Sequence, residues 1–301
     1  QYCHFKSNPN FVRAVRSFEP ITNLSSMNIT NSGWNYITVT DSLKRSSSGS
    51  IEHKMVLSNS EPSEDLVRSI FPELDFKKDI EHIAVTGGKH GNIGNHINEI
   101  PVDHINEVDA ISEGAIHLSG IDKSKPSIIV NAGSGTACIF AKDGEYLHCS
   151  GTGVGGGTVL GLSKLLLNTI DPQEINKLAS MGDPRKTDLI LEDVVSGPIG
   201  QLPSDTTAVN FGRISKTNEK ISREDLAAGI VNLVGQTAAR IATSVALSFN
   251  ATEIIVVGRA PAFVSLRKAL EQAALITNFN PHFPENGEYA SALGAMLIAE
   301  K

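Results

Sequence analysis

Short apolar runs along the second half of the chain repeatedly end at glycines. The clearest run, Ser127 to Ala132, is rich in β-branched residues and is followed by Gly133-Ser134-Gly135, which predicts a buried strand entering a tight turn. Asp143-Gly144 predicts a hairpin, because this dipeptide suits the positive φ angles of two-residue hairpin turns. A second glycine cluster, residues 151–157, precedes a helix predicted from about Thr158. The predicted order is strand, turn, hairpin, glycine loop and helix.

Similar patterns divide the rest of the chain into short strands and amphipathic helices. Apolar and β-branched runs predict strands at residues 11–18, 35–40, 52–57, 82–85 and 253–257. Helical spacing and start signals predict helices from about Pro62 and at residues 107–118, 173–179, 222–249, 262–275 and 289–300. Asp205 is interpreted as a cap, and residues 206–212 as a turn. Short strands alternating with helices indicate an α/β protein, and the hairpins indicate mixed sheets flanked by helices.

Composition and charge limit the classes of function. A chain of 301 residues with 40% hydrophobic content can bury a sizeable core, and two lobes are expected. The net charge of -7 argues against nucleic acid or an anionic membrane as the main partner. Cys3, Cys138 and Cys149 lack the spacing of metal ligands, and no apolar run approaches the length of a membrane span. We therefore expect reduced thiols in a cytoplasmic protein.

The two glycine clusters of the central stretch are candidates for a phosphate site. Glycine lets backbone N–H groups approach an anion closely, and a helix start adds its partial positive charge. For either cluster alone, a tight connection is an equally good interpretation. Gly151, Gly153 and Gly156 spell the dinucleotide fingerprint, but an antiparallel hairpin precedes them instead of a parallel strand. No Walker motif occurs, which argues against a Walker-type ATPase. Because one hairpin separates the two clusters, a ligand that carries phosphate explains the pair better than two independent tight connections.

Glu107 is an acidic residue for which the sequence allows two roles. It stands near the start of the predicted helix 107–118, after the strand 82–85 and its glycine turn Thr86-Gly87-Gly88. From the sequence alone, the more economical interpretation is that this acid complements the helix dipole. A catalytic role is the alternative.

Several motifs in the same order resemble one family. The blocks are TGG at residues 86–88, EVDAISEG at 107–114, NAGSGT at 131–136, GTGVGGGTVLGLSKLL at 151–166, TAVNFG at 207–212 and ENG with SALGA between 285 and 295. Together they look like the type II pantothenate kinases of the actin, Hsp70 and sugar-kinase superfamily. The resemblance covers about residues 80–301, and colinear blocks are more specific than a single glycine motif.

The resemblance implies a two-lobed actin-like ATPase (ribonuclease H-like) fold. The expected N-terminal lobe spans residues 1–125 and the C-terminal lobe 126–301, with the last helix packing back toward the N-terminal lobe. The implied reaction is ATP-dependent phosphorylation of pantothenate, the first step of coenzyme A biosynthesis, with Mg²⁺ bridging the phosphates. A homodimer and feedback by coenzyme A or acyl-CoA are implied as well. The Ala- and Gly-rich helix 222–249 suits either a subunit interface or the core.

The resemblance implies roles for residues of this chain that match the family's functional residues by their position in the motifs. Glu107 matches the general base that takes the proton of the substrate hydroxyl. The matched substrate-binding residues are Thr86, Gly87, Gly88 and His148. The matched ATP-binding residues are Gly133, Ser134, Gly135, Gly155, Gly156, Gly157, Thr158 and Gly258. No residue is assigned as a metal ligand.

Three departures from the family pattern affect these expectations. His148 stands where the family has an arginine that contacts the acidic end of the substrate, and a mostly neutral imidazole should bind a carboxylate more weakly. Arg259 replaces a small hydroxyl residue at the adenosine turn. The family's opening Asp-x-Gly-Gly-Thr loop is either replaced by residues 7–10, where Pro9 and Asn10 cannot cradle phosphate, or lies upstream of Gln1 in a longer chain.

Two other functions stay open at this stage. A non-catalytic protein of the same fold that senses coenzyme A thioesters or nucleotide is favoured by His148 and the absent first loop. A kinase or ATPase that acts on another small alcohol is the second. Glu107 and the two intact glycine turns favour the pantothenate kinase.

Overall fold

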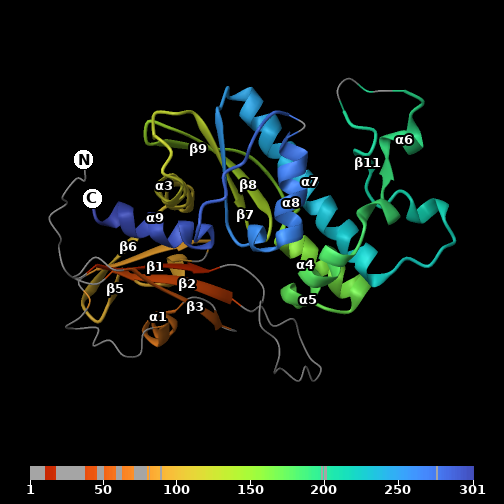
Figure 1. Cartoon of the computed structure of the whole chain (residues 1–301). Coiled ribbons are helices and arrows are strands. Elements are labelled where there is room, and N and C mark those ends of the chain that lie inside the picture. Colours follow the sequence, from red (N-terminus) through yellow and green to blue (C-terminus); the bar gives the residue numbers. More distant parts are fainter. Residues whose placement is uncertain are drawn as a thin grey trace.

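The computed structural model describes residues 11–17, 38–45, 51–58, 63–70, 80, 82–88, 90–197, 199, 202–275 and 277–301. Two mixed β-sheets and the helices that cover them form successive layers (Figure 1). The α/β class and the mixed sheets predicted from the sequence are thereby confirmed.

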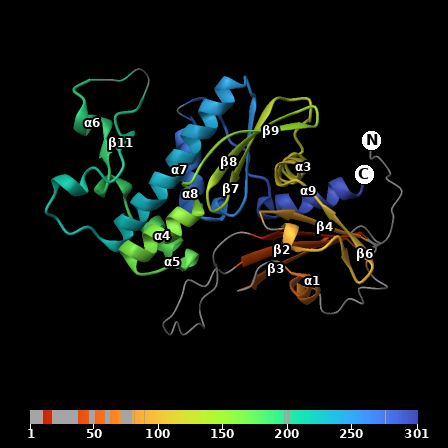
Figure 2. The same ribbon diagram turned by 180° about the vertical axis from the view of Figure 1, so that it is seen from behind.

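The first sheet has the strand order β3-β2-β1-β4-β6-β5. Its strands are β1 (Phe11–Ser17), β2 (Thr38–Arg45), β3 (Ile51–Ser58), β4 (His82–Gly87), β5 (His96–Ile97) and β6 (Ile100–His104). β1 pairs antiparallel with β2 and parallel with β4. Helix α1 (Glu64–Ile70) covers the outer face of this sheet (Figure 2). Its Val67 packs with Ile83 and Val85 of β4. β5 and β6 were not predicted, because they are short and contain Pro101 and charged residues.

The second sheet has the order β12-β7-β8-β9. Its strands are β7 (Ser127–Ala132), β8 (Thr136–Lys142), β9 (Glu145–Thr152) and β12 (Glu253–Val257). β12 and β7 run parallel, so both end at the same edge, with Val257 beside Asn131. The predicted hairpin joins β8 to β9, with Asp143 and Gly144 at φ angles of 53° and 82°.

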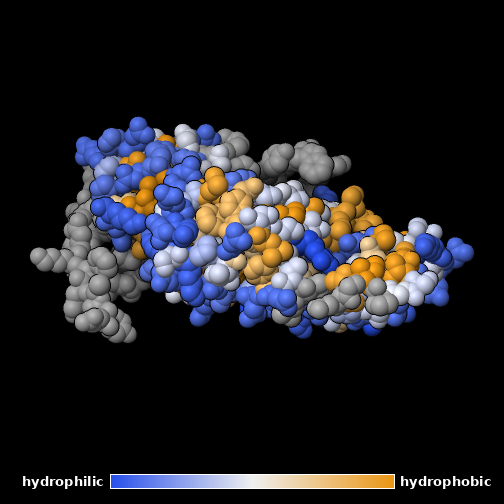
Figure 3. Space-filling model, turned by 90° about the horizontal axis from the view of Figure 1, so that it is seen from above, coloured by the Kyte–Doolittle hydropathy of each residue, from blue (hydrophilic) through white to orange (hydrophobic). Residues whose placement is uncertain are grey.

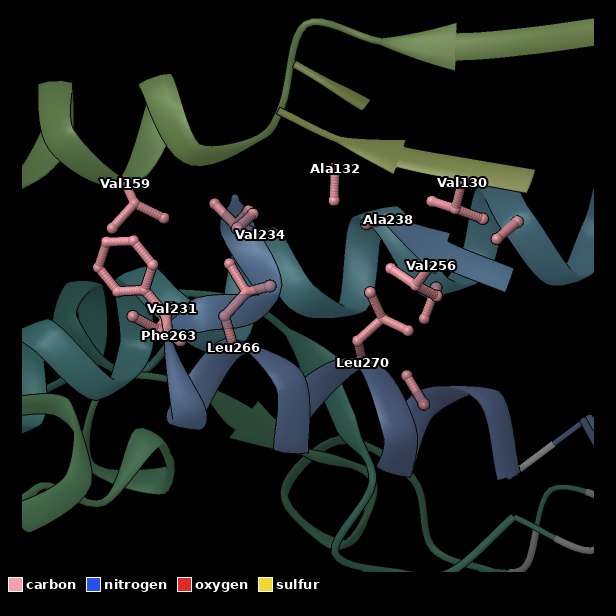
Figure 4. Close-up of a cluster of buried hydrophobic side chains, with 14 of the residues drawn as sticks. Val130, Ala132, Val159, Val231, Val234, Ala238, Val256, Phe263, Leu266 and Leu270 are labelled. Atoms are coloured by element: carbon pink, nitrogen blue, oxygen red, sulfur yellow. The ribbon is translucent and has the colours of Figure 1, made fainter. Parts of the chain in front are cut away.

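On the outer side of the second sheet, α7 (Arg223–Ser248) packs against the strands. Three further helices pack against α7: α4 (Gly156–Leu167), α5 (Pro172–Met181) and α8 (Val264–Leu275). Figure 4 shows Leu266 and Leu270 of α8 packing toward Val234 of α7 and Val256 of β12. Ser222 caps α7 by accepting a hydrogen bond from the Asp225 N–H at 3.0 Å, as the sequence predicts. By length and hydropathy α7 alone among the described helices could cross a membrane, contrary to our expectation, but 61% of its apolar window is buried. Its apolar residues therefore form core.

Helices α3 (Glu107–Ser119) and α9 (Ala290–Ala299) lie between the two sheets. α3 packs on the second sheet through Ile111 and Ala115, whereas α9 packs on the first sheet beside Ala84. The two helices cross at Gly114 and Gly294, where a Cβ on either glycine would lie 1.8 Å from a carbonyl oxygen of the other helix. This crossing explains the glycines of the EVDAISEG and SALGA blocks. The lobe boundary at residues 125 and 126 stays a prediction.

A small lobe between α5 and α7 contains β10 (Leu189–Ile190), α6 (Leu191–Val194) and β11 (Thr207–Val209). Its anchor is the fully buried carboxylate of Asp188. Asp188 accepts hydrogen bonds from the Phe211 N–H at 2.8 Å, Asn232 Nδ2 of α7 at 2.8 Å and Asn210 Nδ2 at 3.1 Å. The prediction of a turn over residues 206–212 is partly wrong, because Thr207–Val209 form β11. A strand of three residues is too short to show an alternating pattern of apolar and polar residues. Short 3-10 turns occur at His90–Asn92, Pro184–Lys186, Ile214–Lys216, Ala260–Ala262 and Gly287–Tyr289.

Candidate functional site

Three glycine turns meet at the edge where β7 and β12 end. The Gly156 N–H donates to the Gly133 carbonyl at 2.8 Å, and the Gly157 N–H donates to the Ser134 carbonyl at 2.9 Å. On the other side, Gly258 at the end of β12 lies against Ala132, because a Cβ there would be 2.6 Å from the Ala132 oxygen. The two glycine clusters of the central stretch therefore form one structure, together with the turn after β12.

The close approach of these turns requires glycine. A Cβ on Gly155 would lie 2.6 Å from the Ser134 oxygen, and one on Gly135 would lie 2.8 Å from the Thr152 oxygen. Gly258 also has a φ of +94°, which side chains rarely allow. Helix α4 begins at Gly156, slightly before the predicted start at Thr158.

Part of the predicted anion site is already occupied by bonds within the protein. The N–H groups of Gly156 and Gly157 bind the first turn, and the Thr158 hydroxyl accepts from the Gly155 N–H at 3.1 Å. Within the residues that the structure describes, the N–H groups of Ser134 and Gly135 have no such acceptor, and both residues are half-buried. These two amides, with the start of α4 behind them, are the donors that this edge offers to an anion.

A second group of predicted residues gathers where β4 and β6 of the first sheet end. The Ile105 N–H donates to the Val85 carbonyl at 2.8 Å, which places the start of α3 beside the turn Thr86 to Gly88. Gly87 has a φ of +100°, and its carbonyl accepts a hydrogen bond from His90 Nδ1. Glu107, half-buried, is the first residue of α3. The predicted base and three predicted substrate residues are thus neighbours.

Asn106 fixes the backbone at Glu107. Its side chain caps α3 by accepting from the Val108 N–H at 2.8 Å and more weakly from the Asp109 N–H at 3.4 Å. With this cap in place, the helix does not depend on the Glu107 side chain to satisfy its first N–H groups. The Glu107 carboxylate is therefore not needed as a cap.

The two edges both face the layer of α3 and α9. Thr86 lies on the side of β4 that carries Ala84, which packs with α9, because alternate residues of a strand share a face. Asn131 similarly lies on the side of β7 that carries Ile129, which packs with α3. The layer between the sheets thus has the predicted substrate turn on one side and the end of β7 on the other.

His148 lies on β9 before the second glycine cluster, and its Nε2 atom would be 3.7 Å from a Cβ on Gly151. It is exposed on the edge strand β9, opposite Ile139, whose side chain packs toward α3. The pairing of β8 and β9 shifts next to it, between Cys138 and Ile139, so Cys149 is an extra residue on β9. His148 therefore faces the same layer as Asn131, from the margin of the sheet.

Glu113 is another acid on α3, and three side chains bind its carboxylate. Burial alone would raise the pKa of Glu113, but hydrogen bonds from Lys123 Nζ, the Tyr146 hydroxyl and Lys301 Nζ lower this pKa to about 2. Burial and the bond to Glu113 raise the pKa of Tyr146. A carboxylate so strongly held in its ionised form is a poor proton acceptor, so Glu113 is unsuited to act as a general base.

Asn131, at the end of β7, has an unusual environment that its sequence pattern did not predict. It is 7% exposed, and its Oδ1 atom is buried without a hydrogen-bond partner among the described residues. Its place as the first residue of NAGSGT was the available signal. No cluster of three or more His, Cys, Asp and Glu in the described part could hold a metal ion. Residues 7–10, the predicted substitute for the first phosphate loop, lie outside the described residues.

Comparisons with known proteins agree with this geometry. A family model described as Fumble matches residues 65–297. The type II pantothenate kinase of Bacillus cereus (strain G9842) is 29% identical over 226 residues, which cover 74% of this chain and 83% of the relative. The type II pantothenate kinase of Staphylococcus aureus (strain MRSA252) is 28% identical over 229 residues, covering 74% and 85%.

Solved structures show a similar fold. The activator of the 2-hydroxyisocaproyl-CoA dehydratase from Clostridium difficile, with bound ADPNP, aligns with a TM-score of 0.62 and 14% identity over 97% of this chain and 94% of that chain. A ROK family glucokinase from Streptomyces griseus, in complex with glucose and AMPPNP, aligns with a TM-score of 0.54 and 12% identity over 86% and 93%. The predicted actin-like ATPase fold is confirmed.

Proposed function

The chain belongs to the Fumble family, in which its matched relatives are type II pantothenate kinases, and we propose that it transfers the γ-phosphate of ATP to the hydroxyl group of pantothenate. The observation that carries the proposal is the meeting of three glycine turns at the end of β7 and β12, facing the layer where α3 begins at Glu107. The product is 4'-phosphopantothenate, and the reaction is the first step of coenzyme A biosynthesis.

The nucleotide binds at the edge of the second sheet in this proposal. The free N–H groups of Ser134 and Gly135 donate to phosphate oxygens, and the start of α4 adds partial positive charge. Gly258 allows the chain to pass close to the adenosine. Mg²⁺, when bound, neutralises charge on the phosphates. Gly155, Gly156 and Gly157 act by holding the phosphate turn in place, through the two hydrogen bonds to Gly133 and Ser134.

Glu107 is the proposed general base. Its carboxylate accepts the proton of the substrate hydroxyl while that oxygen forms a bond to the γ-phosphorus, and the bond from phosphorus to the leaving ADP oxygen breaks. The turn Thr86 to Gly88 holds pantothenate beside this acid. The Thr86 hydroxyl is fully buried and has no partner among the described residues, so it is available to a polar group of the substrate. His148 contacts the carboxylate end of pantothenate.

A coupled assay of ADP release with pantothenate tests this role. We expect wild-type turnover to fall at least about 100-fold in Glu107→Gln, in line with the contribution of a general base. Asp109→Asn is the matched control, because Asp109 is an exposed acid in the same helical turn. Both variants weaken the helix dipole interaction, but Asp109→Asn should keep most of the activity.

Two results would contradict the proposal. Turnover that survives Glu107→Gln would remove the base assignment. ATP binding by the wild type without any ADP release would instead support a non-catalytic protein that senses nucleotide or coenzyme A thioesters, the function favoured by His148 in place of the family arginine.

We extend the proposal to a cytoplasmic homodimer with coenzyme A or acyl-CoA as a feedback ligand. A dimer is supported by large apolar side chains that the monomer leaves exposed, such as Leu165 and Leu166 of α4 and Met181 of α5. A cytoplasmic location is supported by the free thiols of Cys138 and Cys149.

A further inference from the structure

The proposed substrate turn, Thr86 to Gly88, contains a peptide bond between two glycines, and one side chain fixes the orientation of that bond. Gly87 is buried, with a φ of +100°, and its carbonyl oxygen lies 2.5 Å from Nδ1 of His90. A carbonyl oxygen only accepts hydrogen bonds, so Nδ1 of His90 must carry the hydrogen and donate it. The peptide bond between Gly87 and Gly88 therefore has one defined orientation.

His90 is itself held in place on two sides. Its carbonyl accepts a hydrogen bond from the Ile93 N–H at 3.0 Å, and Ile93 is buried in the same cluster as Ile83 of β4. Its ring contacts the ring of His104 at the end of β6, with 5.3 Å between the ring centroids. The donor to Gly87 is therefore attached to the packed first sheet, on the side of β6.

The other side of the same peptide bond carries the N–H of Gly88. Because a trans peptide is planar, its N–H points away from its carbonyl, so the Gly88 N–H points away from His90 and β6. β1 is the neighbour of β4 on that side, and its last residue, Ser17, pairs with Gly87. Gly88 is exposed, and within the described part of the chain its N–H has no hydrogen-bond acceptor. This N–H is a donor at the edge where β1 and β4 both end.

Glycine on both sides would otherwise leave this peptide bond free to turn over. Neither Gly87 nor Gly88 has a Cβ, so both tolerate the backbone angles of either orientation. In the opposite orientation the turn would present a carbonyl oxygen where it now presents an N–H. The hydrogen bond from His90 favours the orientation that presents the donor.

We propose that His90 is a positioning residue for substrate binding, which directs the Gly88 N–H to donate a hydrogen bond to an oxygen atom of pantothenate. His90 does not contact the substrate in this arrangement, because its Nδ1 atom binds Gly87. An amide carbonyl or a hydroxyl oxygen is the acceptor that a backbone N–H recognises. The inference rests on the proposed function, because it requires pantothenate beside this turn.

Calorimetry with pantothenate, in the presence of Mg²⁺ and a non-hydrolysable ATP analogue, tests the inference. His90→Leu removes the donor and should weaken pantothenate binding about tenfold, the upper range for one hydrogen bond. His90→Asn should bind pantothenate within about threefold of wild type, because its side-chain amide also carries a donor. In steady-state assays the loss in His90→Leu should appear in KM, whereas kcat should stay within about threefold of wild type.

His96→Leu is the matched control. His96 is an exposed histidine on β5 of the same sheet, and this variant should bind pantothenate like wild type. A second measurement uses the wild type and does not depend on the folding of a variant. The NMR signal of the Gly88 amide should shift when pantothenate is added, and the shift should be absent in His90→Leu.

Equal pantothenate affinities of wild type and His90→Leu would overturn the inference. A loss in His90→Asn as large as that in His90→Leu would do so as well, because it would mean that the imidazole ring acts through packing. An unchanged Gly88 amide signal at saturating pantothenate would also contradict it. A wild type that binds pantothenate with the expected responses but releases no ADP from ATP would contradict the proposed function alone.

Discussion

Glu107 and Glu113 lie on the same helix, and several side chains hold Glu113 in place. Glu113 is 5% exposed and holds Lys123, Tyr146 and Lys301, which come from three other parts of the chain. It therefore ties α3 to the second sheet and to the C-terminal end. Glu107 stands at the start of the same helix, two turns before Glu113, where the cap residue Asn106 satisfies the first N–H groups and the carboxylate is not required to cap them.

The lowered pKa of Glu113 predicts a dependence of stability on pH. Because the folded pKa of about 2 lies below the ordinary 4.5, the carboxylate stabilises the fold above pH 4.5, and this contribution is lost as the pH falls toward 2. A shift of this size corresponds to roughly 3 kcal/mol at most. In urea unfolding, Glu113→Gln should be clearly less stable than wild type at pH 7, and the difference should shrink toward pH 3.

Glu145→Gln, which changes an exposed acid on β9, serves as the control and should show almost no difference at any pH. A stability difference for Glu113→Gln that stays constant between pH 7 and pH 3 would contradict this account of the carboxylate.

At the scale of elements, the crossing of α3 and α9 is a close helix contact in the layer between the sheets. Gly114 faces Ala290, and Gly294 faces Ala110, with backbone against backbone. Because α3 packs on one sheet and α9 on the other, this contact sets the distance between the sheets.

We predict that Gly114→Ala or Gly294→Ala lowers the free energy of unfolding by about 3 kcal/mol, since an added methyl group would overlap a carbonyl group of the facing helix. Gly161→Ala is the control, because Gly161 is on α4 and a methyl group added there would have no atom within 4 Å. That change should stabilise the protein by up to about 1 kcal/mol through helix propensity. Thermal or urea unfolding of the variants measures both effects. Equal stabilities would show that the helices can move apart freely.

The glycine turns permit a second comparison of the same kind. Gly155→Ala should weaken ATP binding at least about tenfold, because its methyl group would push the loop away from Ser134 and Gly135. Gly153→Ala should keep wild-type affinity, since nothing lies within 4 Å of a Cβ there. Calorimetry with ATP provides the measurement, and similar affinities of the two variants would contradict the proposed phosphate turn.

Local patterns predicted the elements whose limits are marked by glycine or by a cap. The strands Ser127–Ala132 and Glu253–Val257 have their predicted bounds, and α7 begins after Ser222 as its capping signal indicates. β6 escaped prediction because Pro101 and Asp103 interrupt its apolar pattern, and β11 escaped because three residues are too few to show a pattern. Their identity depends on the neighbouring strands with which they pair.

The site was predictable in outline and less so in detail. The motifs placed the two glycine clusters together, and contacts between Gly133 and Gly156 confirm their proximity. The N–H groups of Gly156 and Gly157 bind the first turn because of the way in which the two turns pack together. A local sequence pattern gives no information about this packing. The burial of Asn131 results from pairing with β12, a strand far away in the sequence.

At the scale of the whole molecule, the layers bring both halves of the site to the space around α3 and α9. The small lobe that Asp188 anchors extends to one side (Figure 1). Apolar surface occurs on this lobe and near the middle of the face seen in Figure 3, and Val194, Ile199 and Val209 of the lobe are exposed. Such surfaces favour association with a second copy.

We predict a dimer in solution. Light scattering coupled to size-exclusion chromatography should give twice the chain mass of 32.1 kDa at micromolar concentration. Replacing Leu165 and Leu166 together by Ser should leave the dimer mass unchanged if the lobe forms the interface, and should halve it if α4 does. A wild-type mass of 32.1 kDa at all concentrations would contradict the dimer.

The central claim is that a nucleotide at the turns after β7 and β12 donates its γ-phosphate to an alcohol held beside Glu107. The most direct measurement follows an isotope label from the γ-phosphate of ATP during incubation with pantothenate and Mg²⁺. We predict that the label appears on pantothenate with the wild type and Asp109→Asn, and that it does not with Glu107→Gln. Label that stays in ATP or appears only in inorganic phosphate with the wild type would contradict the account.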